Sequence, residues 1–283
     1  MLVSVIIPTY NSAAFLTEAL GALLDQDYSD LEVVINDDPR TSDETPALVE
    51  AMRASGLNVV YLRENVSMAQ GRKKGAEAAS GEVLIHLDSD MEPSISLVSE
   101  CAALIGEGYD ALVIPESSFG PTYWARCRWL ERCCYEHVSE LEALRCIRSA
   151  IYRELGGHND EMVYFEDKDF DLRVRRHGYR LGRTGNIIYH NEGKLTLRQV
   201  LSKRVDYARS AVVAANYYPD EIRWRGNVLE RYRLFYQHRK LLLRHPVLAL
   251  GTIFMKACEF AVSGLHYQLA QWRRREERMT ASG

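Results

Sequence analysis

The chain has 283 residues, of which 47% are hydrophobic and 26% are charged, and its formal net charge is −4 at pH 7. This length and apolar content predict one large or two small domains with a sizeable core. The weakly negative balance gives no global sign of nucleic-acid binding, so no nucleic-acid partner is expected.

The first 92 residues alternate between apolar stretches, which predict buried strands, and stretches with helical periodicity. The strands are expected to begin at Val3, Leu31, Asn58 and Glu82, and the helices to span Ala13 to Leu24, Thr45 to Ala54 and Met68 to Ala79. Alternation of this kind predicts a parallel sheet covered by helices on both faces. The polar residues that follow such strands are expected to face one ligand crevice.

Two carboxylates, Asp88 and Asp90, follow the fourth predicted strand with one serine between them. Carboxylates aimed at one point repel each other unless a cation lies between them. Hard divalent cations are often held by one or two carboxylates, with substrate phosphates completing the coordination shell. The pair therefore suggests a metal–diphosphate site, although Asp-x-Asp also occurs in ordinary solvated turns.

Three segments after residue 120 carry further candidate residues. The stretch from Tyr123 to Arg132 is aromatic, basic and helical, which suits either an acidic acceptor or a solvated helix face. The acidic run from Glu166 to Asp169 opens a helix, where carboxylates also complement the helix macrodipole. A short apolar strand, Asn186 to Tyr189, ends at His190.

Taken in order, these features resemble family 2 glycosyltransferases with the GT-A fold. The resemblance covers residues 1 to about 215 and rests on Val5-Ile6-Ile7-Pro8-Thr9-Tyr10-Asn11, Asp37-Asp38, Arg72, Asp88-Ser89-Asp90, Gly156-Gly157-His158-Asn159-Asp160-Glu161, Glu166-Asp167-Lys168-Asp169, Arg173, Gly178-Tyr179 and His190. It implies an α/β fold of the GT-A (nucleotide-diphospho-sugar transferase) type, with a mostly parallel central sheet, helices on both faces and a C-terminal helical extension.

The resemblance also assigns residues to the nucleotide, namely Pro8, Thr9, Tyr10, Asp37, Asp38, Arg72 and Asp88. Tyr10 would stack on the base or pack beside it. Asp37 or Asp38 would accept a hydrogen bond from the base or ribose, or would instead cap the following helix. The family's Asp-Asp-Gly-Ser is replaced by Asp38-Pro39-Arg40-Thr41-Ser42, so the preferred base cannot be carried over.

The metal ligands implied by the resemblance are Asp90, Asp88 and His190. Asp90 would bind the ion directly. Asp88 would bind it, the ribose or an intervening water, and His190 would be a further ligand or a diphosphate contact. Oxygen ligands favour Mg²⁺, and an added imidazole makes Mn²⁺ acceptable too.

Catalysis would use a carboxylate that takes a proton from the acceptor hydroxyl. The resemblance points to Asp167 as this base, with Glu166 as the next candidate and Asp169 as a structural or acceptor-side residue. A base opposite the leaving group implies in-line displacement with inversion at the anomeric carbon. The segment Glu142 to Arg148 crosses below the donor sugar in the family. Glu142 and Arg145 are therefore weak candidates for a contact with the donor or the acceptor.

The expected domains are a catalytic domain at 1–215, with a nucleotide-binding half at 1–92 and an acceptor half at 93–215, and a helical region at 216–283. In this last region an apolar run from Val247 to Leu269 lies between arginine clusters. It predicts an interfacial helix on an anionic membrane surface rather than a standard transmembrane span. The alternative is a helix packed on the catalytic domain or on a second copy of the chain. In the second case the protein would be a homo-oligomer.

The predicted function is metal-dependent, inverting transfer of a sugar from a UDP- or GDP-linked donor to an acceptor hydroxyl or phosphate. A polyprenyl-linked glycan is one candidate acceptor, with Lys203 and Arg204 placed to contact its phosphate. The six cysteines show no metal-binding spacing, and Met1-Leu2-Val3 begins no signal peptide. A cytoplasmic protein, peripheral at the cytoplasmic face of the membrane, is therefore expected.

Two other classes of function compete with this prediction. A nucleotidyltransferase also pairs an α/β nucleotide fold with acidic metal ligands, but it would be expected to have a glycine-rich, basic loop where Pro8-Thr9-Tyr10-Asn11 stands. A non-catalytic sugar-nucleotide-binding relative would be expected to have lost some of Asp88, Asp90, Asp167 and His190, all of which are present.

Overall fold

The computed structural model describes residues 1–138 and 141–281. The chain divides into two compact units, and a short internal segment belongs with the C-terminal helices. The first unit consists of Met1–Ser117 and Glu136–Asn191, and the second of Ser118–Tyr135 and Glu192–Gly283. The functional division at residue 215 stays a prediction.

The strands that the structure describes are β1 (Val3–Thr9), β2 (Leu31–Asp37), β3 (Val59–Leu62), β4 (Val83–His86), β5 (Met91–Pro93), β6 (Ala111–Val113), β7 (Glu116–Phe119), β8 (Leu144–Arg148), β9 (Leu181–Arg183) and β10 (Ile188–Asn191). The helices are α1 (Ala13–Leu24), α2 (Thr45–Ala54), α3 (Met68–Ala78), α4 (Leu97–Gly106), α5 (Tyr123–Cys133), α6 (Ser149–Glu154), α7 (Glu166–Arg176), α8 (Leu197–Ala214), α9 (Pro219–Arg225), α10 (Val228–Gln237), α11 (Arg239–Arg244) and α12 (Pro246–Ala281).

A seven-stranded sheet in the order β3-β2-β1-β4-β8-β6-β9 forms the centre of the first unit. The pairs β1–β2, β1–β4, β2–β3 and β6–β9 are parallel, and only β8 runs antiparallel to its two neighbours. The expected mostly parallel sheet is therefore confirmed. A second, three-stranded sheet has the order β5-β10-β7.

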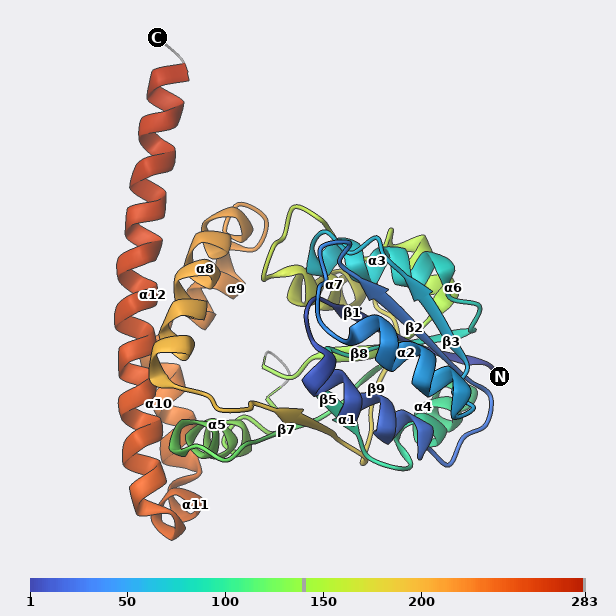
Figure 1. The fold of residues 1–283 in the computed structure, drawn as a ribbon. Coiled ribbons are helices and arrows are strands. Elements are labelled where there is room, and N and C mark those ends of the chain that lie inside the picture. Colours follow the sequence, from blue (N-terminus) through green and yellow to red (C-terminus); the bar gives the residue numbers. More distant parts are fainter. Residues whose placement is uncertain (139–140, 282–283) are drawn as a thin grey trace. The chain divides into compact units, whose positions relative to one another are not determined.

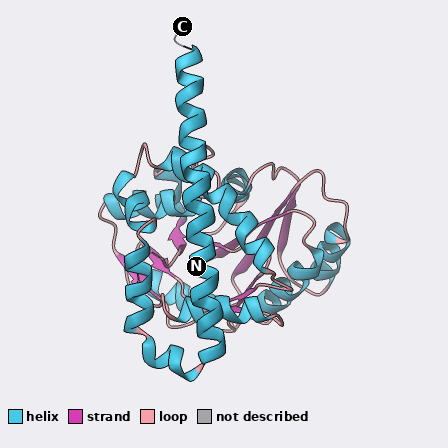
Figure 2. Ribbon diagram, turned by 90° about the vertical axis from the view of Figure 1, so that its left-hand side faces the viewer, coloured by secondary structure: helices cyan, strands magenta, loops and turns pink. Residues whose placement is uncertain are grey.

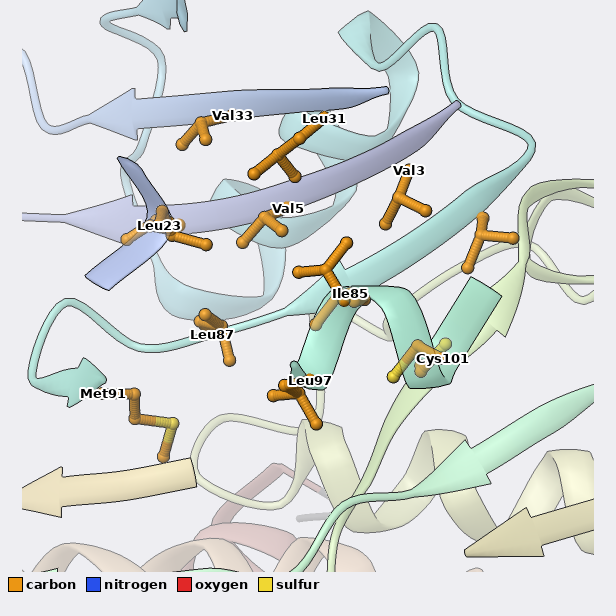
Figure 3. Packing of buried hydrophobic residues seen from close by; sticks show 14 of the residues in the cluster. Val3, Val5, Leu23, Leu31, Val33, Ile85, Leu87, Met91, Leu97 and Cys101 are labelled. Carbon is orange, nitrogen blue, oxygen red and sulfur yellow. The ribbon is translucent and has the colours of Figure 1, made fainter. Parts of the chain in front are cut away.

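Helices cover both faces of the central sheet, as the sequence predicts (Figure 1). On one face, apolar side chains of β1 and β2 pack with those of α1, α2 and α4. Figure 3 shows part of this layer, including Val3, Val5, Leu23, Val33 and Leu97. On the other face, α3, α6 and α7 pack against the sheet. β1 and β2 are buried throughout, because both faces of a parallel sheet are covered.

The second unit is helical and is built around α12, which Figure 2 shows as one continuous helix. Its apolar core joins α5 to α8, α10, α11 and α12. The sequence predicts a single helix from Leu229 to Arg244, whereas the structure has α10 and α11, separated at His238. No proline or glycine marks this break, so local sequence signals gave no warning of it.

All six cysteines are free thiols, as expected from their spacing.

Candidate active site

Asp37 lies at the end of β2, and hydroxyl groups hold its carboxylate in place. Thr41 and Thr9 donate to Oδ1 at 2.6 and 3.3 Å, and the Tyr61 hydroxyl donates to Oδ2 at 2.7 Å. The side chain is fully buried. In this structure Asp37 therefore organises the strand ends, and its predicted contact with the base or ribose stays a prediction.

Asp38 is covered by an arginine that replaces part of the family's usual loop. The Arg40 guanidinium donates to both carboxylate oxygens, at 2.9 and 2.6 Å, and the Arg40 hydrogen bonds hold the pKa of Asp38 at about 2. The same guanidinium lies 5.6 Å from the centre of the Tyr10 ring, which is half exposed. Tyr10 thus offers an open aromatic face at the end of β1, while Pro8 and Thr9 are buried beside it.

Arg72 lies inside a cluster of charged side chains that we call the carboxylate–arginine cluster, composed of Arg72, Arg145, Asp88, Glu116, Glu166 and Asp167. Arg72 is only 2% exposed, and its guanidinium lies 2.6 Å from Asp88, 2.9 Å from Glu166 and 3.3 Å from Asp167. Coulombic attraction from these carboxylates outweighs burial and raises the pKa of Arg72. Arg72 is therefore a fixed cation.

Arg145, on β8, is the second buried cation of the cluster. It donates to Glu116 at 2.9 Å and lies 3.5 Å from Asp88 and 4.0 Å from Asp167. β8 pairs antiparallel with β4, and Cys146 stands opposite Ile85, so Arg145 comes to lie near the acidic residues that follow β4. Asp88 thus lies between two arginines.

The two candidate bases, Glu166 and Asp167, begin α7 and differ in exposure. Asp167 has a 36% exposed side chain, whereas that of Glu166 is 8% exposed. Burial opposes ionisation of Asp167, but Arg72, His158 and Arg145 outweigh it and hold the pKa of this carboxyl well below its usual range. Burial and the neighbouring Asp167 raise the pKa of Glu166. Asp167 is therefore the more accessible of the two carboxyls and the one whose ionised form its surroundings favour.

Asp169, the third acidic residue of this run, is buried and accepts a hydrogen bond from Arg173 at 2.9 Å, one turn along α7. This arrangement suits the structural role that was one of its two predicted roles.

Asp90 and His190 come together through strand pairing. β10 runs antiparallel to β5, and His190 stands opposite Met91. His190 Nε2 lies 3.4 Å from Asp90 Oδ2, and Nδ1 lies 3.6 Å from Glu116 Oε2. A sequence separation of one hundred residues is thus closed by one strand pair.

The pair Asp90 and His190 fits a divalent cation that also binds a diphosphate. One carboxylate and one imidazole face a common point, and both side chains are partly exposed. Across residues 1–138 and 141–281 no group of three or more His, Cys, Asp or Glu side chains is arranged to hold a metal. Such a site needs oxygen ligands from its substrate, which is common for Mg²⁺.

Three members of this site were missed or given little weight by sequence reasoning. Glu116 was not considered, Arg145 had only a weak claim, and His158 was quoted in a motif without a role. The only signal for Arg145 was its place in the segment below the donor sugar. Glu142, its companion there, instead accepts from Arg183 at 2.8 Å. Lys203 and Arg204 belong to the second unit, where Arg204 lies 3.2 Å from Glu259.

A model of one protein family matches residues 4–161, which is more than half of the chain, and the family is described as glycosyl transferase family 2. The chain belongs to glycosyl transferase family 2. The family resemblance that its sequence suggests is therefore confirmed.

Relatives and solved structures extend this result. The chain is 33% identical over 109 residues to the GalNAc(5)-diNAcBac-PP-undecaprenol beta-1,3-glucosyltransferase of Campylobacter jejuni, a match that covers 38% of this chain and 35% of that protein. The match thus spans about a third of that relative's length.

Two solved structures share the fold at low sequence identity. Staphylococcus aureus TarS 1–349 in complex with UDP-GlcNAc has a TM-score of 0.56 at 17% identity, over 98% of this chain and 92% of that one. The Pyrobaculum calidifontis mannosyltransferase PcManGT, in complex with GDP-Man and Mn²⁺, has a TM-score of 0.61 at 18% identity, over 94% of this chain and 86% of that one. The GT-A fold expected from the sequence is confirmed.

Proposed function

We propose that this family 2 chain is a metal-dependent, inverting glycosyltransferase that moves a sugar from a nucleoside-diphosphate sugar to an acceptor hydroxyl. The observation that carries the proposal is the arrangement of the first unit, in which a partly exposed Asp167 belongs to the carboxylate–arginine cluster and the pair of Asp90 and His190 lies beside Glu116 of the same cluster. One side of the cluster offers a base and the other offers ligands for a metal and a diphosphate.

In the proposed reaction Asp167 takes the proton of the acceptor hydroxyl as its oxygen attacks the anomeric carbon. The new bond from oxygen to carbon forms while the bond from carbon to the phosphate oxygen breaks. The nucleoside diphosphate leaves with the electron pair. Attack opposite the leaving group inverts the anomeric centre.

Asp90 and His190 would hold Mg²⁺ or Mn²⁺, and the bound ion would supply positive charge to the diphosphate as it departs. The relative structures contain UDP-GlcNAc in one case and GDP-Man with Mn²⁺ in the other. Both nucleotide classes therefore stay candidate donors. A preference for one nucleotide base would arise from Tyr10 and from Arg40, which covers Asp38.

A donor screen tests the proposal. Purified protein is incubated with UDP- and GDP-sugars, with and without Mn²⁺, and thermal stabilisation and release of nucleoside diphosphate are measured. We expect at least one donor to stabilise the protein and to be hydrolysed in a Mn²⁺-dependent way. Stabilisation without any turnover, with or without added acceptors, would instead favour the non-catalytic relative.

Replacing Asp90 with alanine is expected to abolish the Mn²⁺-dependent part of UDP or GDP binding while leaving the fold intact. The reason is that Asp90 supplies the carboxylate of the proposed two-residue metal site. Isothermal titration with each nucleotide, with and without Mn²⁺, measures the change. Ser89→Ala, at the adjacent position, is the control. Unchanged nucleotide affinity of Asp90→Ala in Mn²⁺ would remove the metal role.

We also propose that α12 holds the enzyme on an anionic membrane surface, where a lipid-linked acceptor would reach it. Over Pro246–Arg274, α12 is long and apolar enough to cross a membrane. However, 39% of the most apolar stretch of this helix is buried within the structure. Leu248, Met255 and Glu259 face the interior of the second unit. The helix thus has a packed side and an open side.

Buried ion pairs favour an interfacial helix over a spanning one. Lys256 of α12 pairs with Glu131 of α5 and with Glu259, and Arg128 donates to Glu259 at 2.9 Å. A charged residue in the middle of a lipid-crossing helix is costly. Here these charges are paired inside the second unit, so the side of α12 that they occupy is committed to protein contacts.

The open side of α12 is apolar from Val247 to Trp272. Exposed large side chains recur at helical spacing, namely Val247, Leu250, Phe254, Leu265, Leu269 and Trp272. Basic residues flank this run, with Arg239, Lys240 and Arg244 before it and Arg273 and Arg274 after it. Each Lys or Arg near an anionic surface contributes about 1 kcal/mol of attraction. An interfacial helix with basic ends is the arrangement that this pattern favours.

The double variant Leu250→Gln, Phe254→Gln is expected to lower recovery with anionic liposomes in a flotation assay at low salt. These side chains are 71% and 55% exposed, so the fold should tolerate the change. Truncation before α12 is less suitable, because it removes part of the core of the second unit. Leu229→Gln, at an exposed leucine of α10, is the control. Equal flotation of both variants and the parent, or no flotation of the parent, would favour a packing or dimer role.

A further inference from the structure

His158 occupies a buried position directly behind the proposed catalytic base. Its side chain is 3% exposed, and its ring stacks on Phe170 at 5.0 Å and meets the edge of His86 at 4.9 Å. Its Nε2 atom lies 3.3 Å from Asp167 Oδ1, slightly longer than the common N–H···O distance. The other ring nitrogen, Nδ1, lies 2.8 Å from the Tyr152 hydroxyl.

The contacts of Tyr152 favour one of the two neutral forms of His158. The Tyr152 hydroxyl accepts a hydrogen bond from the His158 backbone amide at 3.3 Å. A phenol has a single O–H donor. That donor is free to point at Nδ1, and in this arrangement Nδ1 accepts. A neutral imidazole whose Nδ1 accepts carries its proton on Nε2, the atom that faces Asp167.

We propose that Tyr152 and His158 form a positioning pair, in which a neutral His158 donates from Nε2 to Asp167 and fixes the orientation of this carboxylate for proton abstraction. The inference rests on the proposed role of Asp167 as the base. Because its side chain is almost fully buried and contacts Asp167, His158 would act through Asp167 and is a positioning residue.

A neutral donor suits this task better than another cation. Arg72 and Arg145 already lie 3.3 and 4.0 Å from Asp167 and make the carboxylate less basic. A hydrogen bond from an uncharged ring orients the carboxylate with a smaller loss of basicity, because hydrogen bonds between charged partners are the stronger ones.

The groups around His158 favour its neutral form. Burial lowers the pKa of His158, and Arg72 and Arg173 lower it further, whereas Asp167 acts in the opposite direction. The adjacent His86 is also buried, and burial together with His158 and Arg72 lowers its pKa well below the usual range. The ring of His158 is thus expected to stay uncharged through the neutral pH range.

The first test uses ¹⁵N NMR of the full chain labelled at histidine, with the His158→Gln spectrum identifying the signal. We expect Nε2 to be protonated and Nδ1 unprotonated from about pH 6 to about pH 8, the range in which an ordinary histidine titrates. Asp167→Asn should shift the Nε2–H resonance. Protonation on Nδ1, or on both nitrogens, would overturn the proposal whatever the activity of the enzyme.

The second test compares Mn²⁺-dependent hydrolysis of UDP-GlcNAc and GDP-Man by three variants. His158→Phe keeps an aromatic ring against Phe170 but removes the donor, and its kcat should fall about 10- to 100-fold, the scale of a small misplacement of a reacting group. Its donor KM should stay within about twofold, because ground-state binding is not affected. His158→Gln retains an N–H donor and should recover most of the rate. Tyr152→Phe should give an intermediate rate.

The outcomes separate the two proposals. If Asp167→Asn lowers kcat strongly while His158→Phe keeps the parent rate, the positioning role is wrong and the base assignment stands. If Asp167→Asn keeps the parent rate, the base assignment fails, and the NMR result alone decides whether the pair orients this carboxylate. A thermal midpoint measured for each variant distinguishes misfolding from loss of positioning, and equal loss in His158→Gln and His158→Phe contradicts the donor role.

Discussion

Replacing Asp167 with asparagine is expected to lower sugar transfer by about 10²-fold or more, the usual range for losing a general base. Asparagine keeps the size of the side chain but cannot take a proton from the acceptor. Donor binding should stay near normal, because Asp90 and His190, on the other side of the cluster, are unchanged. The measurement is kcat and donor KM under saturating Mn²⁺.

Glu166→Gln is the matched comparison at the adjacent position. Glu166 is nearly buried and accepts from Arg72 at 2.9 Å, so its change should act on the cluster rather than on the acceptor. Full activity of Asp167→Asn together with an inactive Glu166→Gln would move the base by one residue. NMR of the product should show an inverted anomeric centre, and a product of retained configuration would contradict in-line displacement altogether.

Replacing Arg72 with methionine is expected to destabilise the protein by about 3–5 kcal/mol, the scale for removing one partner from a buried charge network. The reason is that Arg72 contacts Asp88, Glu166 and Asp167 while its own side chain is almost fully buried. Without it, Arg145 is the buried cation that remains near Asp88 and Asp167. Urea unfolding near neutral pH measures the loss.

Lys74→Met is the control on the same helix, α3. Lys74 makes an exposed ion pair with Glu77 at 3.3 Å, and exposed pairs of this kind contribute at most about 1 kcal/mol. A loss in Arg72→Met no larger than that in Lys74→Met would show that the cluster does not stabilise the fold.

The Arg72 effect should also depend on pH, in a direction that follows from Asp167. The folded pKa of Asp167 is held below its unfolded value, so its contribution to stability is present above about pH 4 and is lost as pH falls. Without Arg72 the carboxylates take up protons more readily. The difference in unfolding free energy between parent and Arg72→Met should therefore narrow as pH is lowered below about 4, where the unfolded Asp167 carboxyl takes up its proton.

Local sequence determined the helices of the first 92 residues. The predicted helices Ala13 to Leu24 and Thr45 to Ala54 coincide with α1 and α2, and Met68 to Ala79 exceeds α3 by one residue. Such agreement is expected where strands are continuously apolar and helices keep an apolar stripe, because burial then repeats at the period of the element. The position of Asp88 and Asp90 after a strand follows from the same pattern.

Tertiary structure decided which charged residues meet. Arg72 and Glu166 are 94 residues apart, and they join because α3 and α7 pack on the same face of the sheet. His190 reaches Asp90 only through the pairing of β10 with β5. Local periodicity carries no information about such pairings, since contacts between distant segments depend on sheet order and on the packing of whole elements.

In the C-terminal region, too, the sequence predicted an element but not its contacts. Its sequence determined an amphipathic, basic-flanked helix beginning at Pro246, and α12 begins there. The sequence did not indicate which side of that helix faces protein. The buried ion pairs of Lys256 and Glu259 with residues of α5 identify the side of α12 that faces protein. Burying a charge is costly unless an opposite charge lies next to it. The sequence thus determined the elements and their chemistry, and packing between distant segments decided which of these residues form a site.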